Sequence, residues 1–518
     1  MSAIALSLLS GILLTLAFPK TEWWLLAFLA LIPLFKAISG KNPRRAFLLG
    51  FITGLTHFVS LIYWVYHVMG YYGGLSPAVS VLVLLLFTSV LALFIGCFCL
   101  TLAWLERKGS HLFPAAPLLW VTFEWVRSHI FTGFPWELLG YSMYRRLAFI
   151  QAADIVGVYG ISFVLVSVNV ALFLLLFSDR PWKKRLVSGE VISAVVMVAL
   201  LLVYGQTRLE WIEAESASAS KVHIGMAQGN IEQDRKWLKE YQSGTLDIYE
   251  ALTAEAVQRG ATLVVWPETA APFYFDRDKL LTDRLRSIAR NHETHLLVGA
   301  PAISWDSRGR VRLFNRALLL DGSGNTLNRY DKSHLVPYGE YVPLKKWFSF
   351  LGKLVEQVGD FSSGEPGGIL SYDDIRLGPL ICFESIFPYL ARKAHLNGAQ
   401  ILVNITNDAW FGRSSAAYQH FSMLTFRSVE TRSFSVRAAN TGISGVIHAS
   451  GKVLMTTTLF EEMVIDAEVP ILTIDTFYAR YGDFFAFCCI IGIVVLGVRA
   501  YIGARQQGGT KHVFGSKK

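Results

Sequence analysis

Three short motifs in the second half of this 518-residue chain contain side chains that can take part in acid–base or nucleophilic chemistry. Glu268 follows the apolar run in VVWPE, Lys332 lies in YDKSHLVPYGEY, and Cys382 follows the apolar run LGPLI. A thiol has a reference pKa of about 8.5 and reacts as its thiolate, so it needs a base or a cation nearby. A carboxylate can take the thiol proton, and an ammonium group can stabilise an oxyanion. The three side chains therefore have the chemistry to make Cys382 a nucleophile.

Each of these residues also has an ordinary structural explanation when it is considered alone. A carboxylate after a buried strand can cap a helix, a lysine in a loop is commonly solvated, and a buried cysteine is commonly an inert packing residue. Cys382 is the only cysteine outside the long apolar segments, so in an oxidising compartment it could not be half of an internal disulfide. The other cysteines lie within apolar segments: Cys97, Cys99, Cys488 and Cys489.

The region around the three motifs alternates strand-like apolar runs with amphipathic stretches. Strands are predicted at 222–228, 262–267, 295–300, 313–320, 376–382 and 400–405. Helices are predicted at 246–259, 278–291 and 420–436. Strands separated by helices are typical of a layered α/β domain, in which active sites form at strand ends. The polar segment 213–220 (EAESASAS) is predicted to be a linker in front of this domain.

Charge is distributed unevenly along the chain. Residues 221–470 contain 27 acidic and 27 basic residues, whereas the whole chain contains 39 acidic and 48 basic ones. The entire excess of nine positive charges therefore lies outside this region, with 21 basic against 12 acidic residues. Because this excess lies in short loops between apolar segments, it indicates membrane topology rather than nucleic-acid binding.

Long apolar runs dominate residues 1–205 and recur at 478–502. A hydrocarbon core about 30 Å thick requires about 20 apolar residues in a helix. The first apolar segment lacks a basic leader and a convincing cleavage site, and we expect it to be retained. Glu124 and Arg127 interrupt the fifth of the expected segments. Eight spans are expected, near 3–18, 23–39, 47–69, 76–105, 112–130, 155–178, 186–204 and 478–502.

Positive charges are concentrated after the second, fourth and sixth of these segments and at the C-terminus, with Arg145 and Arg146 as an exception. Cytoplasmic loops are enriched in Lys and Arg, so both termini are expected in the cytoplasm. An even number of spans then places residues 205–477 on the opposite face, which in a bacterium is the periplasm.

The order of the three motifs resembles the Glu–Lys–Cys triad of the nitrilase superfamily of carbon–nitrogen hydrolases. The resemblance covers residues 221–470 and continues through NDAWFG at 407–412 and ETRSFSVRAANTG at 430–442. With apolar segments on both sides of this domain, the whole chain resembles the apolipoprotein N-acyltransferases. Further segments similar to that branch are AQGNI at 227–231, VPYGEYVP at 336–343 and GFPWELLGYS at 133–142.

This resemblance implies a multi-spanning α-helical membrane domain joined to a nitrilase-like α/β domain that forms an αββα sandwich. The N-terminal membrane domain is expected at 1–210 and the catalytic domain at 221–470. A C-terminal transmembrane helix is expected at 476–503, followed by a cytoplasmic tail at 504–518.

The resemblance also implies roles for individual residues. Glu268 is expected to be the general base for Cys382, and Lys332 to orient the Glu268 carboxylate and stabilise the oxyanion. The N–H of Phe383, which follows the nucleophile, is expected to be a second oxyanion donor. Glu340 and Glu384 are expected to support the triad by holding the lysine and the substrate amine. Trp237 and Trp410 are expected either to contact acyl chains or to be ordinary core aromatics.

The implied reaction is a two-step acyl transfer. Cys382 would attack the sn-1 ester of a phospholipid, with phosphatidylethanolamine the expected donor, to give a thioester and a lysophospholipid. The α-amine of the S-diacylglyceryl-cysteine of an apolipoprotein would then accept the acyl chain. No metal or cofactor is expected, because the histidines form no HxxxH or HxH pair within a motif and no GxxxxGK[ST] loop occurs. We expect a monomer in the bacterial inner membrane, with no nucleic-acid partner.

The segment 342–362 contains apolar residues at helical spacing with three lysines nearby. Such a segment either enters the membrane interface and gates the entry of lipid, or packs as an ordinary helix on its own domain.

Three other classes of function compete with this interpretation. A membrane-tethered amidase or nitrilase would use the same triad with water as the acceptor, but it would need only one span as an anchor. A lipid- or lipoprotein-binding protein would have no need of a complete triad. A transporter would be expected to have ionisable residues or broken helices near the middle of the membrane, where Glu124, Arg127 and Asp154 are the notable cases.

Overall fold

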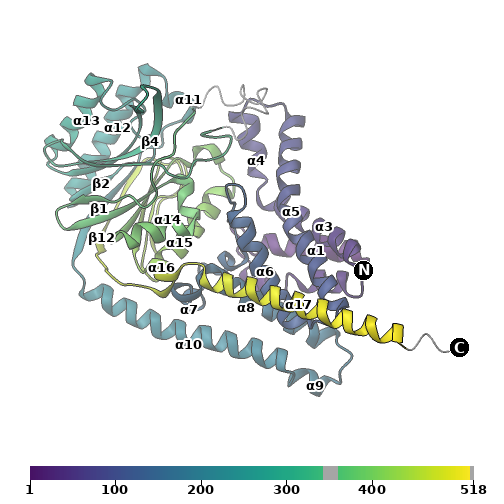
Figure 1. Ribbon diagram of the computed structural model, residues 1–518. Coiled ribbons are helices and arrows are strands. Elements are labelled where there is room, and N and C mark those ends of the chain that lie inside the picture. The colour runs from purple at the N-terminus through teal and green to yellow at the C-terminus, as the bar shows by residue number, and fades with distance from the viewer. Residues whose placement is uncertain (342–359, 514–518) are drawn as a thin grey trace. The chain divides into compact units, whose positions relative to one another are not determined.

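The computed structural model of the protein describes residues 1–341 and 360–513 (Figure 1). The chain divides into two compact units, which we describe separately as the helical unit and the sheet unit. The helical unit contains Met1–Tyr66, Ser76–Gln206 and the chain from Asp483 onward. The sheet unit contains His67–Leu75 and Thr207–Gly482.

Apolar helices build the helical unit, and local sequence signals define where several of them begin. The Ser2 side chain accepts a hydrogen bond from the N–H of Ala5, and Asn42 accepts one from Arg45, so each caps a helix N-terminus. The longer helices are α1 (Ala3–Leu16), α3 (Pro43–Leu61), α5 (Pro77–Arg107), α6 (Leu112–His129), α8 (Ala153–Phe177), α10 (Gly189–Ser218) and α17 (Phe484–Val513).

Fewer helices than the eight expected are suited to cross a membrane. Among the described residues, four helices are long and apolar enough, or five if the bent pair Pro43–Leu61 and Trp64–Tyr72 is one span. Helix α1 has 14 residues, and at 1.5 Å per residue it is shorter than a hydrocarbon core of about 30 Å. Helix α6 contains the buried charges of Glu124 and Arg127. The four helices are Pro77–Arg107, Ala153–Phe177, Trp182–Ser218 and Phe484–Ile502.

Two six-stranded sheets form the centre of the sheet unit. Their strand orders are β12-β1-β2-β3-β4-β5 and β11-β10-β9-β8-β7-β6, with parallel pairing for β1–β2–β3 and for β7–β8–β9. The first sheet consists of β1 (Lys221–Gln228), β2 (Leu263–Val265), β3 (His295–Trp305), β4 (Val311–Leu320), β5 (Thr326–Asp331) and β12 (Met463–Pro470). The second consists of β6 (Leu370–Tyr372), β7 (Ile375–Ile381), β8 (Ile401–Thr406), β9 (Phe434–Ala439), β10 (Gly445–Ile447) and β11 (Val453–Thr456).

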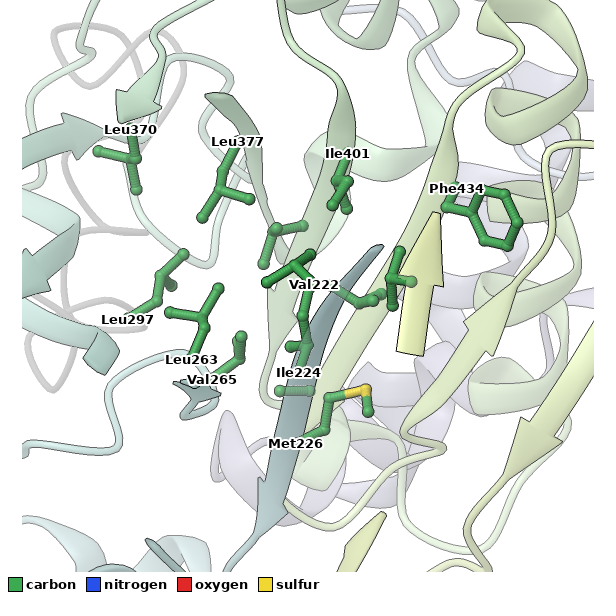
Figure 2. Packing of buried hydrophobic residues seen from close by; sticks show 14 of the residues in the cluster. Val222, Ile224, Met226, Leu263, Val265, Leu297, Leu370, Leu377, Ile401 and Phe434 are labelled. Carbon is green, nitrogen blue, oxygen red and sulfur yellow. The ribbon is translucent and has the colours of Figure 1, made fainter. Parts of the chain in front are cut away.

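The two sheets face each other across an apolar core, because alternate residues of each strand point to the same face. Val222, Ile224 and Met226 of β1 lie in this core together with Leu377 and Ile401 of the second sheet (Figure 2). The opposite face of the first sheet packs on α12 (Lys239–Gln258) and α13 (Lys279–Asn291). Helices α14 (Pro388–Leu396) and α15 (Ala416–Thr431) pack on strands of the second sheet. The layers are therefore helix, sheet, sheet and helix, as expected for an αββα sandwich.

The structure corrects two expectations about elements. The segment 213–220 was expected to be a linker, but α10 continues to Ser218, since alanine and glutamate favour helix. The helix expected at 420–436 ends at Thr431, because Arg432 has a left-handed backbone (φ 49°), and β9 begins at Phe434. The expected gating segment at 342–362 lies mostly outside the described residues.

Candidate active site

Cys382 is the first residue after β7 and begins the short 3-10 turn Cys382–Ile386. Its φ of 53° places it in the left-handed region, which residues with a Cβ rarely adopt. The Glu384 carboxylate accepts a hydrogen bond of 2.7 Å from the N–H of Ile381 and so closes the turn. The chain therefore bends sharply at the strand end and leaves the half-buried thiol of Cys382 at that edge of the sheet.

Glu268 lies beyond β2 in the first sheet and is only 6% exposed. Its Oε1 accepts a hydrogen bond of 2.7 Å from the side-chain amide of Asn315 and lies 3.5 Å from the Nζ of Lys332. Its Oε2 accepts a hydrogen bond of 2.9 Å from the N–H of Asn407. Both carboxylate oxygens are thus held in place, and the carboxylate remains an acceptor.

Lys332 follows β5 and is 1% exposed. Its Nζ donates a hydrogen bond of 2.9 Å to Oε1 of Glu340, in addition to its contact with Glu268. Burial alone would lower the pKa of Lys332, but the Glu340 and Glu268 carboxylates outweigh burial and raise that pKa above its usual range. Lys332 is therefore a permanent cation, which suits it to stabilise negative charge and excludes it as the base.

Asn315 on β4 is a site residue that the sequence did not reveal. Its side-chain amide donates to Glu268 at 2.7 Å and to Glu340 at 2.9 Å, so one group holds both carboxylates. Its backbone carbonyl also accepts the N–H of Lys332 at 2.8 Å. The pairing of β4 with β5 on one side, and with β3 and then β2 on the other, brings these groups together, and an asparagine within a strand gives no signal of it in the sequence.

The surroundings of Cys382 raise the pKa of its thiol. Burial raises this pKa, and the Glu268 carboxylate raises it further, while Lys332 opposes both effects. The Glu384 carboxylate joins Ser333 and His334, which follow Lys332, to Ile381, which precedes Cys382, so the segments of the two residues lie together. A thiol whose pKa is raised needs a base to take its proton when it attacks.

Glu384, one of the two expected supporting carboxylates, joins two segments of the candidate site. Its Oε1 accepts hydrogen bonds of 2.7–3.0 Å from the Tyr330 hydroxyl, the N–H and hydroxyl of Ser333 and the N–H of His334. Ser333 and His334 follow Lys332 in the chain, and the second carboxylate oxygen accepts from Ile381, which precedes Cys382. Glu384 therefore joins the segment of Lys332 to that of Cys382, and Glu340 is the carboxylate that contacts Lys332 itself.

The three aromatic residues singled out in the sequence differ from one another in their surroundings. Trp237 follows α11 (Gln233–Lys236) and is 47% exposed. Trp410 is half-buried, and its ring lies edge-on to that of Tyr72 with centroids 4.9 Å apart. Phe383 is half-buried beside Phe387, with centroids 5.2 Å apart.

A second lysine, Lys236, lies near the base and was not identified from the sequence. It is 1% exposed, and its Nζ donates a hydrogen bond of 3.1 Å to the backbone carbonyl of Glu268. Burial lowers the pKa of Lys236 to about 7, although Glu268 opposes that shift. Lys236 therefore anchors the backbone of Glu268, whereas Lys332 contacts its carboxylate. Within the described ranges, His, Cys, Asp and Glu form no group of three that could hold a metal ion.

Comparison with known proteins agrees with this architecture. Residues 223–478 match the family model for carbon–nitrogen hydrolase, so the sheet unit is a carbon–nitrogen hydrolase domain. Residues 10–171 match the model for the apolipoprotein N-acyltransferase N-terminal domain. The apolipoprotein N-acyltransferase of Geobacter metallireducens is 43% identical over 501 residues, which are 96% of this chain and 95% of that one. The chain belongs to the apolipoprotein N-acyltransferase family.

More distant relatives span a similar length. The apolipoprotein N-acyltransferase of Methylococcus capsulatus is 33% identical over 506 residues, which are 95% of each chain. Among solved structures, an amidase from Nesterenkonia sp. is 22% identical and covers 51% of this chain and 94% of its own, with a TM-score of 0.38.

Proposed function

We propose that this protein transfers an acyl chain from a phospholipid to the N-terminal amine of S-diacylglyceryl-cysteine in apolipoproteins, through a thioester on Cys382. The observation that carries the proposal is the contact of Lys332 with Glu268, together with the Glu384 carboxylate that joins the segment after Lys332 to the residue before Cys382, in a chain of the apolipoprotein N-acyltransferase family. The apolar helices support a lipid donor, because they are suited to a chain that works at a membrane.

In the first step, Glu268 takes the proton from the thiol while Sγ of Cys382 attacks the sn-1 ester carbonyl of the phospholipid. Lys332 and the N–H of Phe383 stabilise the oxyanion of the tetrahedral intermediate. The intermediate collapses when the bond between the carbonyl carbon and the sn-1 oxygen breaks. That oxygen receives the proton from Glu268 and leaves as the hydroxyl of a lysophospholipid, and the acyl chain remains as a thioester.

In the second step, the neutral α-amine of the apolipoprotein attacks the thioester carbonyl. Glu268 takes a proton from the amine, and the same cation and N–H stabilise the second oxyanion. The C–S bond then breaks, and the new C–N bond remains as an amide on the acceptor. The Cys382 thiolate then recovers its proton from Glu268, so the site returns to its starting state.

The environment of the site supports this division of roles. Lys332 cannot take a proton because its neighbours raise its pKa, whereas Glu268 is an acceptor beside the thiol. Asn315 and Asn407 hold Glu268 in place through hydrogen bonds from neutral N–H groups. A base, a cation and a nucleophile fixed before the substrate arrives lower the cost of reaching the transition state.

We further propose that the enzyme is a monomer of the bacterial inner membrane and that its sheet unit faces the periplasm. The concentration of Lys and Arg in alternate loops supports this orientation. The two substrates of the proposed reaction are a membrane phospholipid and a lipid-anchored protein, so one membrane surface would present both.

Intact-mass spectrometry of the purified protein tests the proposal. Incubation with phosphatidylethanolamine should add the mass of one acyl chain, and a diacylated lipopeptide should remove it while its own amine becomes acylated. Cys382→Ala should show no adduct. If no adduct forms with the lipid but the same cysteine hydrolyses a small amide, a membrane-tethered amidase replaces the proposed transferase.

A further inference from the structure

The backbone carbonyl oxygen of Cys382 is the meeting point of three side-chain donors. The Ser385 hydroxyl lies 3.1 Å from this oxygen, the Asn404 amide nitrogen 3.3 Å, and Nε2 of His420 3.1 Å. All three donors are buried. A carbonyl oxygen has two lone pairs, so three buried side-chain nitrogen and hydroxyl groups around one oxygen leave it fully surrounded by possible donors.

A buried cluster of charged residues holds His420 in this position. Its Nδ1 lies 3.1 Å from Oδ1 of Asp408 and 3.0 Å from the guanidinium of Arg437. Arg437 also donates 2.6 Å hydrogen bonds to Oδ2 of Asp408 and to the side-chain oxygen of Asn404. Asp408, His420 and Arg437 are at most 1% exposed. One arginine therefore orients two of the three donors to the Cys382 carbonyl.

The position of the ring hydrogen of His420 is part of the inference, because its contacts fit either neutral tautomer. Nδ1 lies beside an Asp408 oxygen, which can only accept, and beside the Arg437 guanidinium, which can only donate, while Nε2 also lies 2.9 Å from the Ser385 hydroxyl. We assign the hydrogen to Nε2, where it faces the Cys382 carbonyl; Nδ1 then accepts from Arg437, and Oδ1 of Asp408 accepts from the Thr406 hydroxyl at 2.9 Å. Burial and Arg437 lower the pKa of His420, whereas Asp408 opposes them.

The geometry of a peptide group connects this carbonyl to catalysis. The carbonyl oxygen of Cys382 and the N–H of Phe383 belong to one planar trans peptide and point in opposite directions. Donors that fix the oxygen therefore also fix the direction of the N–H, and they polarise the group so that the N–H becomes a stronger donor. The left-handed backbone of Cys382 makes such fixation necessary, because that conformation is unfavourable for a residue with a Cβ.

We propose that His420 is a positioning residue that holds and polarises the peptide between Cys382 and Phe383, so that its N–H is aimed at the oxyanion. Asp408 and Arg437 act through His420 and Asn404 in this arrangement. The inference rests on the proposed function, because it assumes that the Phe383 N–H stabilises an acyl-transfer oxyanion.

Two substitutions of similar size separate the proposed role from general packing. The terminal amide of His420→Gln can place an N–H near the position of Nε2. His420→Asn offers an oxygen near Nδ1, which can satisfy Arg437, but it does not reach the carbonyl. We expect His420→Asn to acylate about 100-fold more slowly than wild type in single turnover, and His420→Gln to stay within about 10-fold.

Alkylation of Cys382 by iodoacetamide is the second readout. A purely structural role of His420 would slow alkylation and acylation together, whereas the proposed role affects acylation alone. This reaction displaces iodide at a saturated carbon and forms no oxyanion, so it reports the thiol without the Phe383 N–H. We expect alkylation of both variants to stay within about 3-fold of wild type. If His420→Asn acylates normally, or if its acylation and alkylation fall together, the proposal is wrong.

Acylation should be followed with p-nitrophenyl butyrate as well as phosphatidylethanolamine. A wild-type protein that accepts only the activated ester would contradict the proposed lipid donor, while the ratio between the variants would still test His420. If His420→Asn fails to fold, Ser385→Ala removes a different donor from the same carbonyl. It should slow acylation about 10-fold with alkylation unchanged, and equal effects on both reactions would overturn the proposal.

Discussion

The pKa of the Cys382 thiol bears directly on the chemistry of the candidate site. Many reactive cysteines have a lowered pKa and are thiolates at rest. Cys382 differs, because burial and the Glu268 carboxylate raise its pKa and outweigh the nearby Lys332. A thiol whose pKa is raised reacts slowly with water-borne electrophiles, and in the proposed mechanism it becomes a nucleophile when Glu268 takes its proton.

Replacement of the base separates its charge from its proton-transfer role. Glu268→Gln removes a negative charge that raises the pKa of Cys382, so the thiolate fraction at pH 8 should increase. The rate of iodoacetamide alkylation, measured from pH 6 to 10, should therefore show a lower apparent pKa than wild type. Acylation should nevertheless fall by about 100-fold or more, because the general base is lost.

Controls for this experiment come from the same chain. Cys382→Ala gives the background alkylation of the other cysteines, and Glu232→Gln removes an exposed carboxylate of the sheet unit and should change neither rate. An unchanged apparent pKa together with normal acylation in Glu268→Gln would contradict both roles of Glu268.

The sequence predicts a candidate site from residues that carry unusual chemistry, and it does not reveal the residues that hold them through geometry. Glu268, Lys332 and Cys382 stand at the ends of recognisable motifs, so their types and positions make them a candidate triad. Asn315 and His420 act only because strand pairing and helix packing bring them beside residues that are far away in the chain. No local pattern distinguishes such an asparagine or histidine from a structural one.

At the scale of elements, strands that read as apolar runs were predicted, whereas the edge strands β6, β11 and β12 and the buried inner strands β9 and β10 were missed. Strands such as β8 (ILVNIT) are buried on both faces and read as continuous apolar runs. At the sheet edge, β12 contains Asp466 and Glu468, and β11 is half-exposed, so neither shows such a run. Strand β9 was assigned to the preceding helix, because a single left-handed residue, Arg432, separates the two elements.

The short segment His67–Leu75 is an element whose role was not expected. It lies in sequence between apolar helices but belongs to the sheet unit. The Tyr72 hydroxyl donates a hydrogen bond of 2.9 Å to the carbonyl of Ala409, and its ring contacts Trp410. The same loop provides the N–H of Asn407 that holds Glu268. Tyr72 therefore stabilises the loop that positions the base.

Two substitutions at Tyr72 test this coupling. Tyr72→Phe loses one hydrogen bond and keeps the ring contact, so acylation should slow by at most about 5-fold. Tyr72→Ala loses both contacts and should slow acylation by about 10- to 50-fold. Single-turnover acylation with intact-mass detection measures both effects. Tyr274→Ala, at an exposed tyrosine of the same unit, is the control, and equal rates for Tyr72→Ala and this control would exclude the coupling.

At the scale of the whole molecule, the apolar runs predict eight spans, whereas four or five of the described helices are long and apolar enough to cross a membrane. A window of apolar residues does not distinguish a spanning helix from a shorter one. Helix α1 has 14 residues, and the second expected span contains only a 3-10 turn and the seven-residue α2 (Ile32–Ile38). The division into a helical and a sheet unit, by contrast, follows from composition, because the change from apolar runs to balanced charge is visible near residue 210.

The orientation of the two units relative to the membrane can be measured with single cysteines in the Cys382→Ala background. Ser323 lies in the exposed turn between β4 and β5, and Lys184 lies exposed in the short basic helix α9 (Trp182–Leu186) of the helical unit. If basic loops are cytoplasmic, Ser323→Cys should react with a membrane-impermeant maleimide in intact spheroplasts. Lys184→Cys should react only after the membrane is permeabilised, because its label cannot cross the bilayer. The parent without either new cysteine gives the background. Labelling of Lys184→Cys in intact spheroplasts would reverse the orientation and place the site on the cytoplasmic face, where it could not meet acceptors that are anchored outside.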